Sequence, residues 1–182
     1  MAETPKSLSV SFRQDAGSIE HNNRIFVADN VDGSRSADNI IYVQKDLREF
    51  YHEIFDGALA EYNSAQTRKD RVIENYYDHV KRGEKLFQEV VVTFGNSETC
   101  GVGSENWQTA IKLLDEYMRE FEKRNPNLKV FNAVMHLDEA TPHLHIDFVP
   151  VCYNQNQGLK TRVSMKRAIQ QMLGITTDKK KM

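Results

Sequence analysis

Apolar residues follow the two-residue period of a β-strand, or form short β-branched runs, in several parts of the chain. Leu8, Val10 and Phe12 alternate with polar residues, and Ile40–Val43 (IIYV) is apolar throughout. The predicted strands cover residues 8–12, 40–43, 86–94, 128–138, 143–153 and 159–161. Only the tight segment Asp138–Pro142 connects the fourth strand to the fifth, so we expect these two strands to pair as a hairpin.

Other segments repeat apolar residues at helical spacing and carry residues that begin or end helices. Asp46 is a candidate cap with Glu49 three residues later, and Ser164 is a candidate cap of the last helix. Asn125-Pro126 is a helix stop. The predicted helices extend over residues 46–59, 70–83, 104–125 and 164–174. Strands joined by hairpins, with helices inserted in blocks, predict an α+β fold with a mainly antiparallel sheet of about five strands covered by helices.

The stretch from Gln14 to Asn39 is mostly polar and is too long for a simple turn. Loops of this length inside a compact domain are usually functional or unstructured. The chain has no internal repeat and no Pro-rich or Gly/Ser-rich linker, which predicts a single domain over residues 1–182.

The composition excludes several classes of protein. Hydrophobic residues make up 40% of the chain and charged residues 27%, which is typical of a globular protein and not of a disordered or collagenous one. No window approaches the roughly 18 apolar residues of a membrane span, and the N-terminus lacks the pattern of a signal peptide. Cys100 and Cys152 form no CxxC pair, which favours a reducing cytoplasm.

Charge is distributed unevenly, although the formal net charge is only −2. Residues 156–182 contain seven basic residues and one acidic residue, and a nucleic-acid-binding protein needs only such a local basic patch. The run Lys179–Lys181 is by itself typical of a solvated, frayed terminus. Because the sequence stops within this run, directly after a predicted helix, we expect the chain to be the N-terminal part of a longer protein.

Three of the six histidines, His136, His143 and His145, lie within ten residues of one another. Residues two apart in a strand share a face, so His143 and His145 point the same way while Leu144 and Ile146 point into the core. His136 ends the partner strand of the predicted hairpin and can reach the same place. Three neutral imidazoles that converge in this way predict a metal site with open coordination positions, which suits a catalytic ion.

Acidic residues are interleaved with these histidines. We expect Asp138, Glu139 and Asp147 to orient the imidazoles through hydrogen bonds or to add an oxygen ligand. A single histidine on a strand is most often structural or exposed. Three histidines together with interleaved acidic residues favour a metal site.

Two histidines that flank one hydrophobic residue, as in His143-Leu144-His145, resemble the signature of the HUH endonucleases. More specifically, HLDEATPHLHIDFVP (His136–Pro150) resembles the third motif, HxDExTPHxH, of the MobV (Pre/Mob) family of plasmid relaxases. The match continues through Thr141-Pro142 and is therefore far more specific than the two histidines alone.

Three further segments resemble motifs of the same family. His21–Arg24 (HNNR) resembles its first motif, HNxR, Ser34–Asn39 (SRSADN) resembles its SRSxxN stretch, and Arg68–Asp70 resembles its RKD segment. In the relatives a tyrosine directly follows the SRSxxN asparagine, whereas Ile40 does so here and the next tyrosine is Tyr42. No role is therefore carried over to a tyrosine at that position.

The resemblance implies an HUH-endonuclease-like fold and the N-terminal relaxase domain of an enzyme that initiates conjugative mobilisation. Such an enzyme nicks one DNA strand at a plasmid transfer origin by transesterification and keeps the 5′ phosphate covalently attached. The implied cofactor is one divalent ion, Mn²⁺ or Mg²⁺, bound by His136, His143 and His145. The implied partner is plasmid DNA, as the single-stranded nick region and the adjacent duplex or hairpin, in a bacterial cytoplasm. No membrane contact is implied for this domain, and a homodimer would form through a missing C-terminal part.

The first-motif histidine is the nucleophile in MobV relatives, which points to His21 and a phosphohistidine intermediate. A neutral imidazole is a competent nucleophile near pH 7 without a large pKa shift. Arg24 is the candidate for forked hydrogen bonds to the reacting phosphate, and Arg35 is a second candidate phosphate contact. We also predict a catalytic role for Glu139, whether as metal ligand, base or orienter of the nucleophile. Tyr42 is the one competing nucleophile that we consider.

Other DNA contacts are predicted outside these motifs. Arg68 and Lys69 either contact the DNA backbone or form a solvated helix entry. The predicted Asn154–Thr161 turn and the basic tail would line a single-strand groove.

Three other functions compete with this interpretation. A replication initiator of the same superfamily would use a tyrosine on a helix, and the HNxR-like segment argues against it. A non-catalytic DNA-binding module would have lost His21 or a ligand histidine, and both are present. A hydrolase with a histidine-bound metal and a small substrate fits less well with the long polar loops and the basic tail.

Overall fold

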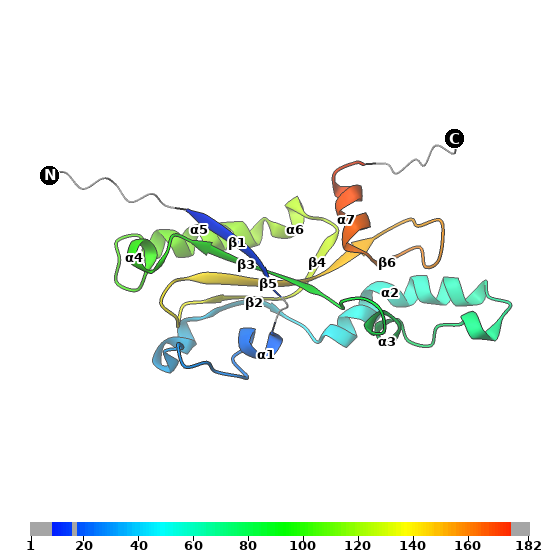
Figure 1. Cartoon of the computed structure of the whole chain (residues 1–182), viewed down its shortest axis with the longest axis horizontal. Coiled ribbons are helices and arrows are strands. Elements are labelled where there is room, and N and C mark those ends of the chain that lie inside the picture. Colours follow the sequence, from blue (N-terminus) through cyan, green and yellow to red (C-terminus); the bar gives the residue numbers. More distant parts are fainter. Residues whose placement is uncertain (1–8, 16–17, 176–182) are drawn as a thin grey trace. The chain divides into compact units, whose positions relative to one another are not determined.

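The computed structural model describes residues 9–15 and 18–175, so Leu8 of the first predicted strand and the run Lys179–Lys181 lie outside the described residues. Its strands form one sheet in the order β1-β3-β5-β4-β2, with β6 paired to β5 (Figure 1). These strands are β1 (Val10–Asp15), β2 (Ile40–Gln44), β3 (Gln88–Phe94), β4 (Leu128–His136), β5 (His143–Cys152) and β6 (Arg162–Val163). β1 pairs antiparallel with β3, β2 with β4, and β6 with β5. The predicted α+β class and mainly antiparallel sheet are confirmed.

Helices connect these strands in blocks. They are α1 (Ile19–Asn22), η1 (Gly33–Asp38, 3-10), α2 (Leu47–Ser64), η2 (Lys69–Arg71, 3-10), α3 (Tyr76–Lys81), α4 (Ser97–Cys100), α5 (Trp107–Arg119), α6 (Phe121–Arg124) and α7 (Met165–Met172). Asp46 and Ser164 cap α2 and α7, as predicted, by accepting hydrogen bonds from backbone N–H groups of the first turn. Among the described residues, no helix combines the length and the apolar character that a membrane crossing requires.

The chain divides into two compact units, and β4 and β5 contribute residues to both. The first unit contains the described residues up to Gln44 together with Gln88–Phe121 and Asn132–Asp147. The second contains Lys45–Phe87, Glu122–Phe131 and the described residues from Phe148 onward. Each unit is built around its own set of buried side chains.

In the first unit, helix α5 buries one of its own sides. Ala110, Leu114 and Met118 are four residues apart and are all buried, as expected for the apolar stripe of an amphipathic helix. Tyr117 of the same helix lies against Phe12 of β1, with 5.7 Å between ring centroids. Buried residues of the strands complete this core, among them Ala133, Val134, Met135, Leu144 and Ile146.

In the second unit, the core is largely aromatic. Phe55 of α2 lies between Tyr51 and Tyr76, with ring centroids 5.1 and 4.9 Å away. Phe131 of β4 contacts Phe50 and Phe87 at 5.9 and 5.3 Å. These rings attach α2 and α3 to the strand segments of the unit.

One predicted helix begins later than its apolar spacing suggested. We expected it to start near Asp70, but α3 starts after Asn75, whose side chain accepts a hydrogen bond from the Asp78 N–H. The preceding residues cannot continue a helix because the Asn63 side chain bonds both the N–H and the carbonyl of Ile73. A long-range contact has therefore overridden the local pattern.

Smaller differences have similar causes. The long segment predicted as a loop contains α1 and η1, which are too short to show helical periodicity and are capped by Ser18 and Asp32. The helix expected from Ser104 begins at Trp107. The last strand is Arg162–Val163, while Leu159, expected in that strand, is a buried residue just before it.

Candidate metal centre

The predicted histidines converge in the first unit. His136 ends β4, and His143 and His145 begin β5 across the hairpin. Their ring centroids are 4.7 to 5.2 Å apart. His21 of α1 joins them, with its centroid 5.6 Å from that of His136 and 5.7 Å from that of His145. Residues 124 positions apart in sequence thus form one cluster of four imidazoles.

Each of the three hairpin histidines donates one ring N–H to an oxygen. His136 Nε2 lies 2.9 Å from the Asn22 carbonyl oxygen, and His143 Nδ1 lies 2.9 Å from the Thr141 carbonyl oxygen. His145 Nδ1 lies 2.7 Å from Oε1 of Glu89. Carbonyl and carboxylate oxygens only accept, so these nitrogens carry the protons and the tautomer of each neutral ring is decided.

The opposite ring nitrogens are left with free lone pairs. His136 Nδ1 and His145 Nε2 are buried and have no hydrogen-bond partner among the described residues. Burial lowers the pKa of both rings to about 3, so they are neutral at physiological pH. A buried acceptor without a donor is unfavourable. A histidine that binds a divalent ion through one ring nitrogen usually donates the N–H of its other ring nitrogen to a nearby oxygen, as these residues do.

The spacing of the ligand atoms also fits a metal ion. Two overlapping sets have donor atoms that all lie within 4.8 Å of one another. One set is His21, His136 and His145, and the other is His136, Glu139 and His143. His136 belongs to both sets, His145 to the first and His143 to the second, so no single set holds all three predicted ligands. Their rings are nevertheless neighbours, and His21 and Glu139 are near enough to take part.

Glu89 of β3 is the orienting residue that we did not predict from the sequence. It lies within the strand predicted over residues 86–94 (LFQEVVVTF), and a carboxylate inside such a mostly apolar run is the signal that could have identified it. Besides His145, it accepts a hydrogen bond from the Asn22 side chain at 2.7 Å. The carboxylate is only 3% exposed, so its interactions are made away from bulk solvent.

Among the described residues neither Asp138 nor Asp147 forms a hydrogen bond with an imidazole, so the expectation that they orient the rings in this way is wrong. Their alternative role as an oxygen ligand stays a prediction. Asp147 instead accepts hydrogen bonds from the side-chain amides of Asn22 and Asn132, at 2.9 and 2.8 Å. Burial raises its pKa to about 6. The alternation of side chains along a strand predicts the face of the sheet on which a residue lies. It does not predict which neighbouring side chain on that face forms a hydrogen bond with the residue.

Arg24 connects α1 to the acidic loop after β4. It has a positive φ of 54°, a left-handed backbone that is uncommon outside glycine and clusters at functional sites. Its Nε lies 2.9 Å from Oδ2 of Asp138, its Nη2 lies 2.9 Å from Oε1 of Glu139, and its Nη1 lies 3.4 Å from Nε2 of His21. Burial would raise the pKa of Asp138, but hydrogen bonds from Arg24, Asn39 and Ser36 hold it well below its usual value.

Glu139 lies at the centre of the site. Its Oε1 is 3.8 Å from Nε2 of His21, 3.8 Å from Nε2 of His143 and 3.9 Å from Nδ1 of His136. Burial acts to raise the pKa of this carboxyl, but the neighbouring His143 and Arg24 outweigh it and the pKa is lowered. The charged form of the carboxylate is therefore favoured. It lies within 4 Å of histidines from both candidate sets.

Arg35 braces the loop that carries Asp138 and Glu139. Its Nη1 donates to the Leu137 carbonyl at 2.6 Å and its Nη2 donates to the Glu139 carbonyl at 3.1 Å. Ser36 and Asn39 each donate a side-chain hydrogen bond to Asp138 at 2.8 Å. Three side chains of the SRSxxN-like segment thus hold the loop that carries Asp138 and Glu139. The contact of Arg35 with DNA stays a prediction.

The remaining predicted residues lie elsewhere. Arg68 and Lys69 belong to the second unit, where both are exposed and Arg68 forms an ion pair with Asp70. Tyr42, the competing nucleophile, donates its hydroxyl to Asp115 at 2.9 Å, and burial together with that carboxylate raises its pKa. A phenol held in this way is a weak nucleophile.

The chain matches one family model and is similar to several solved structures. The family model Mob_Pre, described as plasmid recombination enzyme, matches residues 17–181. One similar solved structure is the Mn-bound MobM relaxase domain (MOBV; Mob_Pre) in complex with 22 nucleotides of plasmid pMV158 oriT DNA. It is 19% identical to this chain, the match covers 84% of this chain and 73% of that one, and the TM-score is 0.46. Another, the same domain with 23 nucleotides, is also 19% identical, with 87% and 73% covered and a TM-score of 0.44. No curated protein gives a significant match.

Proposed function

Because this chain belongs to the Mob_Pre family of plasmid recombination enzymes, we propose that it nicks one strand of plasmid DNA at a transfer origin through a covalent histidine intermediate. Membership confirms the family predicted from the four sequence motifs and makes the chain a DNA relaxase.

One observation carries the metal proposal. The ring N–H groups of His136, His143 and His145 are all used by oxygens around them, and the lone pairs of His136 and His145 are buried without a partner. These three residues would hold one divalent ion, Mn²⁺ or Mg²⁺. When bound, that ion would supply Lewis-acid stabilisation of negative charge on the scissile phosphate.

We assign the nucleophile to His21. Its side chain is 26% exposed, whereas those of His136 and His145 are 0% and 8% exposed, so it is the more accessible to DNA. A guanidinium only donates, so the contact between Arg24 Nη1 and His21 Nε2 supports a lone pair on that nitrogen.

His21 would attack the scissile phosphate through Nε2. The Nε2 lone pair forms a bond to phosphorus while the bond from phosphorus to the 3′ oxygen breaks. The leaving 3′ oxygen takes a proton from solvent, and the imidazole loses its Nδ1 proton. The 5′ phosphate stays on His21 as a phosphoramidate.

Arg24 and Glu139 would act as positioning groups. Arg24 contacts both His21 and Glu139, so one guanidinium fixes the nucleophile relative to the acidic loop. Glu139 would orient this guanidinium and keep the site negative enough for a cation. Arg35, Arg68 and Lys69 remain proposed DNA contacts, of which the last two are exposed.

The test is the attachment site of the DNA. Supercoiled plasmid with the cognate origin is incubated with protein and Mn²⁺, and the covalent adduct is mapped by mass spectrometry. We expect DNA on His21, released by mild acid because a phosphoramidate is acid-labile. H21A should bind Mn²⁺ normally and fail to nick. The control H52A, which alters an exposed histidine of α2, should bind Mn²⁺ and nick DNA normally.

Two outcomes would overturn parts of the proposal. DNA attached to Tyr42 or to any other tyrosine would refute the histidine nucleophile. Loss of Mn²⁺ binding in H21A would make His21 a ligand of the ion, as its grouping with His136 and His145 allows.

A further inference from the structure

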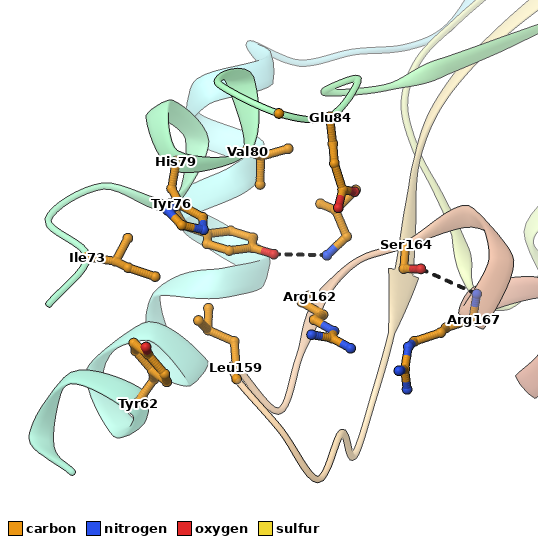
Figure 2. A pocket seen from close by; sticks show the side chains of 13 residues that line it. Tyr62, Ile73, Tyr76, His79, Val80, Glu84, Leu159, Arg162, Ser164 and Arg167 are labelled. Carbon is orange, nitrogen blue, oxygen red and sulfur yellow. Dashed lines mark hydrogen bonds between the residues drawn. The ribbon is translucent and has the colours of Figure 1, made fainter. Parts of the chain in front are cut away.

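A cavity of about 530 Å³ lies within the second unit and plays no part in the site described above. It is formed by the end of α2, by α3, by the segment before β6 and by the start of α7 (Figure 2). Its volume is within the range of pockets that bind small molecules, roughly 300–1,000 Å³.

One side of the cavity is positively charged. Arg162 of β6 and Arg167 of α7 line it (Figure 2). Nε of Arg162 is buried and has no hydrogen-bond partner among the described residues. Arg167 donates to the Gln155 side chain at 2.6 Å, and neither arginine forms an ion pair with a carboxylate of the described part of the chain. A desolvated guanidinium N–H without an acceptor is unfavourable unless an anion joins it.

The other side of the cavity is aromatic and apolar. Tyr62, Tyr76 and His79 line it together with Ile73 and Leu159. Tyr76 is held in place because its hydroxyl accepts a hydrogen bond from the Val163 N–H at 3.1 Å, and its ring stacks on His79 at 6.0 Å with an interplanar angle of 20°. Figure 2 shows Tyr62 and Ile73 on the side of the cavity away from Arg167.

We propose that this cavity binds one nucleotide of single-stranded DNA, with its phosphate on Arg162 and Arg167 and its base against the aromatic side. The identity of the polymer as DNA rests on the proposed function. Glu84 also lines the cavity, so its two arginines and one glutamate leave a net formal charge of +1. That charge matches one phosphodiester and disfavours a free nucleoside di- or triphosphate, which carries several negative charges.

The charge is tested by the salt dependence of DNA binding. Binding of a fluorescently labelled single-stranded oligonucleotide is measured by anisotropy at several salt concentrations for R162Q, R167Q and the double variant. Because both arginines contact the same phosphate, the slope of log K against log salt should fall by about 0.7 in the double variant and by less in each single variant. K166Q removes the same charge from an exposed residue of α7 that does not line the cavity, and it should leave the slope unchanged.

The base is tested separately. Y62A should weaken oligonucleotide binding by about tenfold, the size of one lost base–aromatic stack. An oligonucleotide with 5-iodo-2′-deoxyuridine should cross-link on irradiation to Tyr62, Tyr76 or His79, as mapped by mass spectrometry. Inorganic phosphate should not displace the oligonucleotide at millimolar concentration, because it lacks a base. Displacement by inorganic phosphate would identify a site for a free anion and overturn the proposal.

The outcomes separate this proposal from the proposed function. A protein that nicks DNA but has the same salt slope in R162Q, R167Q and the double variant refutes the cavity alone. A protein that does not nick but loses DNA affinity in these variants refutes the relaxase proposal and leaves the cavity as a DNA site. Circular dichroism checks folding, and the exposed Arg167 carries the test if R162Q fails to fold.

Discussion

Oε1 of Glu89 in β3 lies 2.7 Å from Nδ1 of His145 in β5, and both side chains are buried. A carboxylate in this position fixes the tautomer of a metal-binding imidazole and raises its basicity. We expect E89Q to weaken Mn²⁺ binding about 10- to 100-fold, because an amide oxygen accepts the hydrogen bond without the negative charge. Isothermal titration calorimetry of the purified protein measures this change.

The matched control is E53Q. Glu53 is an exposed carboxylate of α2 in an ion pair with Lys45, so its replacement removes the same charge without touching a histidine. Equal Mn²⁺ affinity in E89Q and E53Q would show that Glu89 does not tune the site.

Replacing Arg24 should affect both stability and nicking. Arg24 pairs with Asp138, which is 0% exposed, and with Glu139. R24Q would leave the buried carboxylate of Asp138 without its cation, and we expect the free energy of unfolding to fall by about 3 kcal/mol. R24K keeps the charge but loses the fork, so it should recover part of the stability and little of the nicking.

These effects are read from urea unfolding and from plasmid nicking at a temperature where the variants remain folded. DNA affinity is measured in parallel. If nicking and affinity fall by the same factor, Arg24 is a simple DNA contact and does not position the nucleophile.

Divalent metal should stabilise the folded protein through the histidine cluster. At a free Mn²⁺ concentration of 100 times the dissociation constant, linkage predicts about 2.7 kcal/mol of added stability. H143A and H145A should abolish this gain, whereas H79A, which alters a histidine of α3 in the second unit, should retain it. Thermal unfolding with and without Mn²⁺ measures the gain, and nicking that continues in excess EDTA would contradict the metal site.

Alkaline pH should destabilise the second unit through Tyr76. Burial raises the pKa of Tyr76 to about 12 from an ordinary value near 10. A raised pKa means that the unfolded chain loses the proton first, so this stability is complete below pH 10 and is lost as the pH rises to 12. The full loss is about 2.7 kcal/mol for a shift of two pKa units. Urea unfolding between pH 8 and 11.5 should show a shallower decline for Y76F than for the unaltered protein.

The sequence by itself determined the residues of the centre and their grouping on strands. His143 and His145 are two apart in a strand, so they share a face by geometry alone, and a short turn brings His136 to the same end of the sheet. The caps at Asp46 and Ser164 were equally readable, because a helix cap depends on side chains within the first turn.

Only the tertiary structure decided which partners complete that centre. Glu89 reaches His145, and Arg35 and Asn39 hold the loop at residues 137–139, through hydrogen bonds between residues 56 to 104 positions apart in the chain. Such contacts depend on the strand order β1-β3-β5-β4-β2 and on how the segment after α1 turns at Arg24. Local periodicity indicates the face on which a residue lies, but the neighbour it meets there is decided by strand order and register, which local sequence does not encode.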